Sequence, residues 1–307
     1  MNNQYPVVLF VFKRPSTTKI LLDLIVSSGI DKMYIFADGP KNEQEKVTTD
    51  IVRKIIVDFS KDNPEIRIQK KFFEVNQGLK QTITDGLNHV FQKESAAIIL
   101  EDDCLPSEDF FRFTTTMLTK YASKPQIMSV AGTSIGSFSD NSYDFSRYQL
   151  CWGWATWARA WDLYDPKMRE LGSANWGSTI SRVTRYPHMR KYWDMMLNIV
   201  QSGWLKTWDY QWTYSVFVYN GLAVIPGCNL VSNIGFDKSA TNTKVKSSLS
   251  NMAQSNLQWP LIHPKSISEN YALSKTIENR FYNNPVAILG MLRQYIYWKW
   301  SQHASRH

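Results

Sequence analysis

"AAIILEDDCLPSEDFF", residues 96–111, is the stretch that decides the fold, because a strand pattern and a helix pattern meet within it. The apolar run Ala97–Leu100 has the length of a buried strand, and Ser107–Tyr121 carries apolar residues at helical spacing. Three acidic side chains stand in a row between the two patterns: Glu101, Asp102 and Asp103. Adjacent carboxylates repel one another and are costly away from water without a balancing positive charge. A hard divalent cation at the strand end would explain the row, and an acidic surface loop is the plainer alternative.

The same succession of strand and helix runs through the first 131 residues. The apolar runs predicted as strands are Pro6–Phe12, Met33–Ala37, Ile66–Phe72, Ala97–Leu100 and Ile127–Ala131. The segments predicted as helices are Ser16–Ser28, Glu43–Phe59, Leu79–Phe91 and Ser107–Tyr121. Runs that are apolar throughout indicate strands covered on both faces. We therefore expect an α/β fold with a mostly parallel, Rossmann-like central sheet and helices on both faces.

Polar side chains follow three of the predicted strands at the point where each ends. Lys13 and Arg14 follow the first strand, Asp38 follows the second, and the acids of residues 101–103 follow the fourth. Ligands of such sheets bind beyond the carboxyl ends of the strands. We therefore expect these side chains to point into one crevice.

The chain after residue 131 has a less regular pattern. The polar stretch 134–147 is predicted to be a loop, Leu222–Pro226 a strand, and 238–258 a mobile loop or lid, because it is polar and has no periodicity. The segments with helical spacing are Tyr186–Val200, Asp209–Tyr219 and Pro285–Trp300.

Composition excludes several classes of protein. Of the 307 residues, 43% are hydrophobic and 20% are charged, as is typical of a soluble globular chain. The three cysteines have no metal-binding spacing, and no secretory signal is predicted, so we expect a cytoplasmic protein. The net charge of +8 favours anionic partners, but the basic residues are scattered and no nucleic-acid-binding motif occurs. No HExxH, GxSxG or Walker motif occurs either.

Several motifs occur in an order that resembles the GT-A glycosyltransferases, and most closely the N-acetylglucosaminyltransferase I type. Chains with the WGWATW motif of this kind are bacterial sugar transferases. The resemblance spans roughly residues 5–240 and rests on order and spacing. Its segments are VVLFVFKRP (7–15), FADGP (36–40), NQGLKQTITDGLNHVF (76–91), EDD (101–103), WGWATWARAW (152–161), TWDYQW (207–212) and IPGCNLVSNIGF (225–236).

The resemblance implies a metal-dependent, inverting transfer of a sugar from a nucleotide donor, a UDP-sugar by expectation, to a hydroxyl of a glycan acceptor. Such transfer would belong to bacterial surface polysaccharide synthesis. A domain is expected over residues 1–265, with a nucleotide-sugar half (1–131) and an acceptor half (132–265), followed by a helical extension (266–307). The acceptor could be lipid-linked, and residues 285–302 either form a core helix or contact the inner face of a membrane.

For the donor, the resemblance implies that Asp103 binds Mn²⁺ or Mg²⁺ while Glu101 and Asp102 hold ribose and sugar hydroxyls. Asp38 would accept the N–H of the uracil, although Asp-Gly is also a common turn. Arg14 would contact the base, or it is a solvated charge. Lys80 would reach a phosphate from the start of its helix, where Asn76 or Gly78 alternatively only caps.

For the acceptor, the resemblance implies that Asp209 is the catalytic base, and capping of the following helix is an equally good alternative. Trp152, Gly153 and Trp154 would contact the acceptor, because aromatic faces suit sugar rings, or the tryptophans pack in the core. Two functions of other classes stay open. One is a sugar-phosphate nucleotidyltransferase, and the other is a carbohydrate-binding module without catalysis.

Overall fold

A computed structural model describes residues 5–137, 139–235 and 251–304. The strands of its main sheet are β1 (Val7–Val11), β2 (Lys32–Ala37), β3 (Arg67–Phe72), β4 (Ala96–Glu101), β6 (Ile127–Ala131), β7 (Tyr143–Ser146), β8 (Trp154–Trp157) and β9 (Leu222–Pro226). A small second sheet pairs β5 (Cys104–Pro106) with β10 (Val231–Asn233). The helices are α1 (Pro15–Ser27), α2 (Glu43–Asp62), α3 (Leu79–Phe91), α4 (Glu108–Lys120), α5 (Ala158–Trp161), α6 (Ala174–Val183), α7 (Pro187–Gln201), α8 (Asp209–Val218), α9 (Tyr271–Ile277), the π-helix η1 (Glu278–Tyr282) and α10 (Pro285–Ala304).

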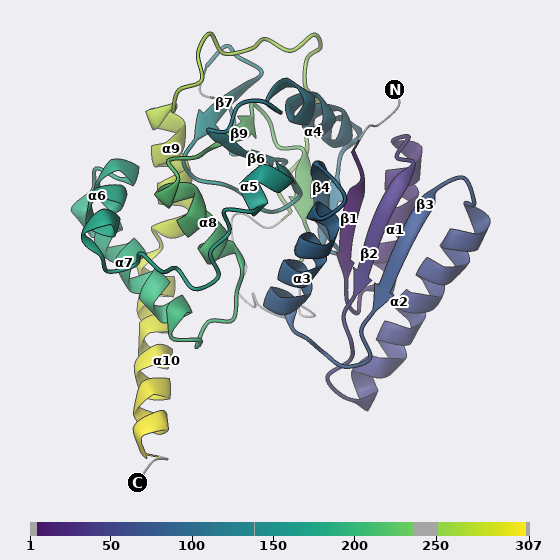
Figure 1. Cartoon of the computed structure of the whole chain (residues 1–307), viewed down its shortest axis with the longest axis horizontal. Helices are drawn as coiled ribbons and strands as arrows, with labels where there is room; N and C mark the ends of the chain where they lie inside the picture. Colours follow the sequence, from purple (N-terminus) through teal and green to yellow (C-terminus); the bar gives the residue numbers. More distant parts are fainter. Residues whose placement is uncertain (1–4, 138, 236–250, 305–307) are drawn as a thin grey trace.

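The main sheet has eight strands in the order β3-β2-β1-β4-β8-β6-β9-β7 (Figure 1). The strands β1, β2, β3 and β4 are parallel to one another, and β6 pairs in parallel with β9. Only β7 and β8 among these eight run in the opposite direction, because β8 is antiparallel to both β4 and β6, and β7 is antiparallel to β9. The predicted mostly parallel α/β sheet is therefore confirmed.

Alternate residues of the central strands pack against helices on opposite faces of the sheet, as the apolar runs predicted. Val7 and Leu9 of β1 belong to a core cluster with residues of α1, α2 and α4. Val8 and Phe10 belong to another cluster with residues of α3, α5 and α8. A third cluster lies between β6, β9 and the helices α6, α7 and α8. Because both faces of these strands are covered by apolar side chains, their charged and polar side chains lie at the strand ends.

Two parts of the sheet differ from the prediction. The stretch 134–147, predicted as a loop, contains the edge strand β7, whose polar Asp144 and Ser146 hid the strand pattern. The motif WGWATW contains β8, which inserts between β4 and β6 with its four residues buried. Both strands pair only with segments distant in sequence, and such pairing leaves little local signal.

The C-terminal part of the chain packs against the core cluster that contains α6, α7 and α8. Residues 251–258 contain no helix or strand, and the rest of the predicted loop, 238–250, lies outside the described residues. After α9 and η1, α10 projects away from the body of the molecule (Figure 1). Within the described chain, no helix has the length and apolar character needed to cross a membrane.

Candidate active site

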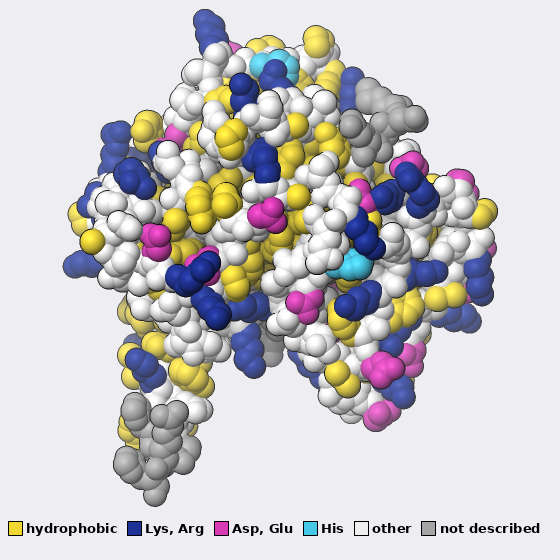
Figure 2. Space-filling model, viewed as in Figure 1, with side chains coloured by type: hydrophobic (Ala, Val, Ile, Leu, Met, Phe, Trp, Pro, Cys, Tyr) yellow, Lys and Arg dark blue, Asp and Glu magenta, His cyan; other side chains and the backbone are white. Residues whose placement is uncertain are grey.

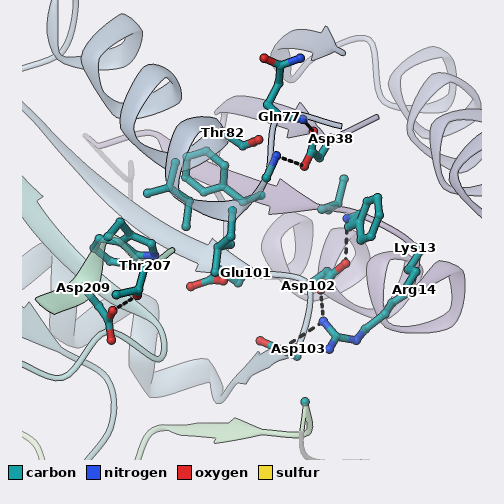
Figure 3. Close-up of a pocket in the computed structure, with 18 of the residues that line it drawn as sticks. Lys13, Arg14, Asp38, Gln77, Thr82, Glu101, Asp102, Asp103, Thr207 and Asp209 are labelled. Atoms are coloured by element: carbon teal, nitrogen blue, oxygen red, sulfur yellow. Dashed lines mark hydrogen bonds and ion pairs between the residues drawn. The ribbon is translucent and has the colours of Figure 1, made fainter. Parts of the chain in front are cut away.

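A pocket of about 680 Å³ opens at the carboxyl ends of β1, β2 and β4. Its lining includes Arg14 after β1, Asp38 after β2, Glu101 at the end of β4 with Asp102 and Asp103 directly after it, and Asp209 from the start of α8. The structure thus brings together the side chains that the sequence placed at separate strand ends. Figure 3 shows Glu101 between Asp209 on one side and Asp102 on the other.

Arg14 forms ion pairs with two of the three consecutive acids. Its Nη1 atom donates to Asp102 Oδ1 and lies 3.1 Å from Asp103 Oδ2. The backbone N–H of Phe12 also donates to Asp102 Oδ2, at 2.8 Å. These contacts hold Asp102 firmly at the floor of the pocket, and they join the end of β1 to the end of β4.

The carboxylates of residues 101–103 and Asp209 repel one another around Glu101, although Lys13, Lys41 and Lys206 also line the pocket. Burial raises the pKa of Glu101 well above its usual range, and the charges of Asp103, Asp102 and Asp209 raise it further. Burial also raises the pKa of Asp102 to about 6, although Arg14 opposes this shift. An additional cation would relieve this repulsion, so the electrostatics of the pocket suit a bound positive ion.

The donor set fits a magnesium-type ion that shares its ligands with a substrate. Among the described residues no group of three or more His, Cys, Asp or Glu side chains is placed to enclose a metal. Mg²⁺ and ions like it are commonly held by one or two carboxylates and completed by phosphate oxygens and water. Asp103, partly exposed at the pocket wall, offers such a carboxylate.

Gly235 is a site residue that the sequence did not single out. A Cβ atom at this position would overlap the carboxylate of Asp103, and it would lie 3.1 Å from Asn233 Oδ1. Both Asn233 and Gly235 line the pocket, and the backbone N–H of Ile234 donates to Asp103 O at 2.9 Å. The glycine therefore allows the end of β10 to approach Asp103 closely. In the sequence, the glycine of the NIGF segment could have indicated this close approach.

Asp38 lines the pocket and is saturated by hydrogen bonds from the protein, and its contact with the N–H of a base stays a prediction that these bonds do not favour. Its carboxylate accepts from the backbone N–H groups of Gly39, Gln77 and Gly78 and from Nδ2 of Asn76, at 2.8 to 3.1 Å. A carboxylate has about four acceptor positions. Asp38 is 6% exposed and fixes the loop 76–78 against the end of β2.

Lys80 does not line the pocket. On α3 the residues that do are Leu79, Thr82 and Ile83, which share one helical face. Lys80 follows Leu79 directly and therefore points about 100° away from it around the helix axis. It is half-buried, and burial lowers the pKa of its ammonium group. The predicted phosphate contact of Lys80 is not supported by this placement.

Asp209 is the first residue of α8, directly after the cap position at Trp208. Its carboxylate accepts a hydrogen bond from the hydroxyl of Thr207 and faces the pocket (Figure 3). Burial raises the pKa of Asp209, which makes its carboxylate more basic. Asp209 therefore both starts α8 and faces the pocket, so these two alternatives do not exclude each other.

The predicted acceptor residues separate into two groups. Trp152 lines the pocket, and its ring lies 5.6 Å from the ring of Phe281 in η1. Trp154 is 1% exposed and stacks on Trp208 in the core, so its face is closed to any ligand. Gly153 has a φ of +62°, and a Cβ there would lie 2.7 Å from Val231. Protein packing, and not a sugar ring, therefore explains both Gly153 and Trp154.

No model of a protein family matches the sequence, and no curated protein matches it. Among solved structures, one similar fold is a mannosyltransferase from Pyrobaculum calidifontis in complex with GDP-Man and Mn²⁺. It is 9% identical with a TM-score of 0.39, and the match covers 71% of this chain and 70% of that one. A 4-diphosphocytidyl-2C-methyl-D-erythritol synthase from Anaerococcus prevotii is 12% identical with a TM-score of 0.34, over 53% and 74% of the two chains. A UDP-glucose pyrophosphorylase complexed with UDP-glucose is also 12% identical, with a TM-score of 0.29, over 48% and 64%.

Proposed function

We propose that the protein is a metal-dependent, inverting glycosyltransferase of the GT-A type. It would transfer a sugar from a nucleotide donor, with UDP as the expected nucleotide, to a hydroxyl of a glycan acceptor. One observation carries the proposal: the acids of residues 101–103 and Asp209 share a single pocket at the carboxyl ends of parallel strands. The motif order supports the finer proposal of an N-acetylglucosaminyltransferase I type enzyme in bacterial surface polysaccharide synthesis.

The acids after β4 are assigned to the donor. A pocket of about 680 Å³ lies within the range of small-molecule sites. Asp103 would hold Mn²⁺ or Mg²⁺, and such an ion stabilises the negative charge that develops on a diphosphate leaving group. Asp102, fixed by Arg14 and Phe12 N, and Glu101 would accept hydrogen bonds from ribose and sugar hydroxyls. Arg14 forms ion pairs with both aspartates, so we assign it to holding their carboxylates in position.

Asp209 is assigned as the base. Inverting transfer needs one group that takes the proton of the acceptor hydroxyl as its oxygen attacks the anomeric carbon. Asp209 lies in the same pocket as Glu101, its pKa is raised by burial, and Thr207 fixes its orientation. The acceptor would then enter beside Trp152, the one predicted acceptor residue that lines the pocket.

The two other functions explain less of the site. Nucleotidyl transfer to a sugar phosphate uses a nucleophile that is already ionised, so it gives Asp209 no proton to remove. A binding module without catalysis gives no reason to bury carboxylates that repel one another. Release of pyrophosphate from a nucleoside triphosphate and a sugar phosphate, in place of UDP release, would favour the nucleotidyltransferase.

A thermal-shift screen of nucleotide sugars with and without Mn²⁺ tests the proposal. We expect the melting temperature to rise most when a UDP-sugar and Mn²⁺ are present together. Asp103→Asn should remove the metal-dependent part of this rise. Asp50→Asn removes the same charge from an exposed position on α2 and should leave the rise unchanged. An unaltered response in Asp103→Asn would exclude this carboxylate as the metal ligand.

A further inference from the structure

The helix α10 carries apolar side chains on both of its faces. Its inner face contains Ile288, Met291, Leu292 and Tyr295, which pack against the core cluster around α7 and α8. The ring of Tyr295 also lies 5.7 Å from the ring of Trp204. These contacts attach the first half of α10 to the body of the molecule.

The outer face of α10 is apolar as well, although nothing in the described chain covers it. The exposed side chains are Leu289 (58%), Ile296 (64%), Tyr297 (70%) and Trp300 (68%). Leu289, Ile296 and Trp300 are spaced by seven and four residues, so they lie along one side of the helix. Large apolar side chains gathered on an exposed surface mark a place of interaction.

The charge of the outer face indicates the chemistry of the partner. Arg293 is exposed on this face, Lys299 is exposed beside it with its ammonium group 5.5 Å from the ring centroid of the inner-face Tyr295, and the sequence contains no Asp or Glu after Glu278. Exposed Trp and Tyr next to Arg and Lys are characteristic of surfaces that enter the headgroup region of a membrane. Basic side chains add attraction to anionic lipids.

The direction of α10 relates this surface to the pocket. In Figure 1, α10 runs away from the body of the molecule toward the side on which β1 and β2 end, which is also the side of the pocket. Figure 2 shows hydrophobic side chains together with Lys or Arg on this projecting segment.

We propose that the outer face of α10, defined by Leu289, Arg293, Ile296, Tyr297 and Trp300, docks the protein on an anionic lipid surface. The helix lies in the headgroup region and does not cross the bilayer. If the proposed function holds, docking keeps the enzyme at the surface that would carry a lipid-linked acceptor. Docking itself depends only on the surface of α10.

Co-sedimentation of the full chain with lipid vesicles tests the docking directly. We expect binding to vesicles that contain phosphatidylcholine and phosphatidylglycerol, weaker binding to phosphatidylcholine alone, and a decrease as salt is added. The double variant Ile296→Ser/Trp300→Ser should bind about tenfold more weakly or worse. Arg293→Gln/Lys299→Gln should lose the preference for the anionic vesicles.

The matched control is Val47→Ser/Ile51→Ser, which removes two exposed apolar side chains from α2. It should bind like the unmodified protein, and circular dichroism should show that all variants are folded. Failure of the unmodified protein to bind anionic vesicles at low salt would overturn the proposal. So would a dimer that Ile296→Ser/Trp300→Ser disrupts in light scattering without vesicle binding. Because no transfer is measured, these outcomes do not depend on the enzymatic activity.

Discussion

Two buried aspartates show how the surroundings of a carboxylate decide its use. Asp38 accepts from four neutral N–H donors, which leaves it no free acceptor position for a ligand. Asp102 has one backbone donor and one arginine, and its pKa is raised to about 6. The first carboxylate holds the loop 76–78 in place, and the second lies in a pocket whose negative charge is incompletely balanced.

Asp38→Ala should therefore reduce stability as well as donor binding. Removal of the carboxylate leaves the buried N–H group of Gly39 and the partly solvent-accessible N–H groups of Gln77 and Gly78 without their acceptor, so the free energy of unfolding should fall by roughly 1–3 kcal/mol. Urea denaturation measures this change. A side chain that only contacted the base would lower nucleotide affinity at unchanged stability, and that result would contradict the loop-holding role.

Asp209→Asn should lower the rate of transfer while leaving donor binding unchanged. The amide keeps the shape of the side chain but cannot take a proton, so the rate of transfer should fall by about 10²–10⁴-fold. Binding of the nucleotide sugar with Mn²⁺ should change little in isothermal titration calorimetry. Turnover at the level of the unmodified enzyme would show that Asp209 is only part of the helix start.

At the scale of elements, the small sheet of β5 and β10 decides the shape of the pocket wall beside Asp103. The pairs Asn233–Cys104 and Val231–Pro106 bring a segment from late in the sequence beside the acids after β4. Gly235 then follows β10 at the point of closest approach to Asp103. The position of Asp103 is thus fixed by two segments more than a hundred residues apart.

Gly235→Ala should damage the site through this contact. The added methyl group must displace the Asp103 carboxylate, and overpacking of this kind costs about 1–3 kcal/mol, which lowers metal-dependent donor affinity by about 5- to 150-fold if it falls wholly on the bound state. Gly177→Ala is the control, because a Cβ at that helical position meets nothing within 4 Å. Equal affinities of the two variants, measured by titration with a UDP-sugar and Mn²⁺, would remove Gly235 from the site.

At the scale of the whole molecule, the C-terminal segment is tied to the core by a buried acid. Glu278, at the start of η1, is 2% exposed and accepts a hydrogen bond from the hydroxyl of Tyr148. Burial raises the pKa of Glu278 above the usual 4.5. The folded state therefore retains a proton that the unfolded state loses as the pH rises, and stability falls as the pH increases above about 4.5.

Glu278→Gln should remove this pH dependence. The amide oxygen still accepts the hydrogen bond from Tyr148, but the side chain no longer has to carry a buried charge. The variant should gain stability relative to the unmodified protein at about pH 8 and gain little or nothing at about pH 5. Urea unfolding at both values measures the difference. A gain that is equal at the two pH values would show that the charge of Glu278 is not its cause.

The sequence by itself determined the α/β architecture and most of the pocket. Apolar runs and helical spacing depend on neighbouring residues, and the carboxyl ends of parallel strands must meet at one edge, so Arg14 and the acids of residues 101–103 could be expected together. Asp209 was expected beside them only from the resemblance of the motif order. Only the tertiary structure decided that Asp38 is saturated, that Trp154 is core, that Lys80 turns away and that Gly235 adjoins Asp103. Each of these facts depends on a contact between distant segments, and residue type and local spacing do not encode which donors, rings or glycines will meet.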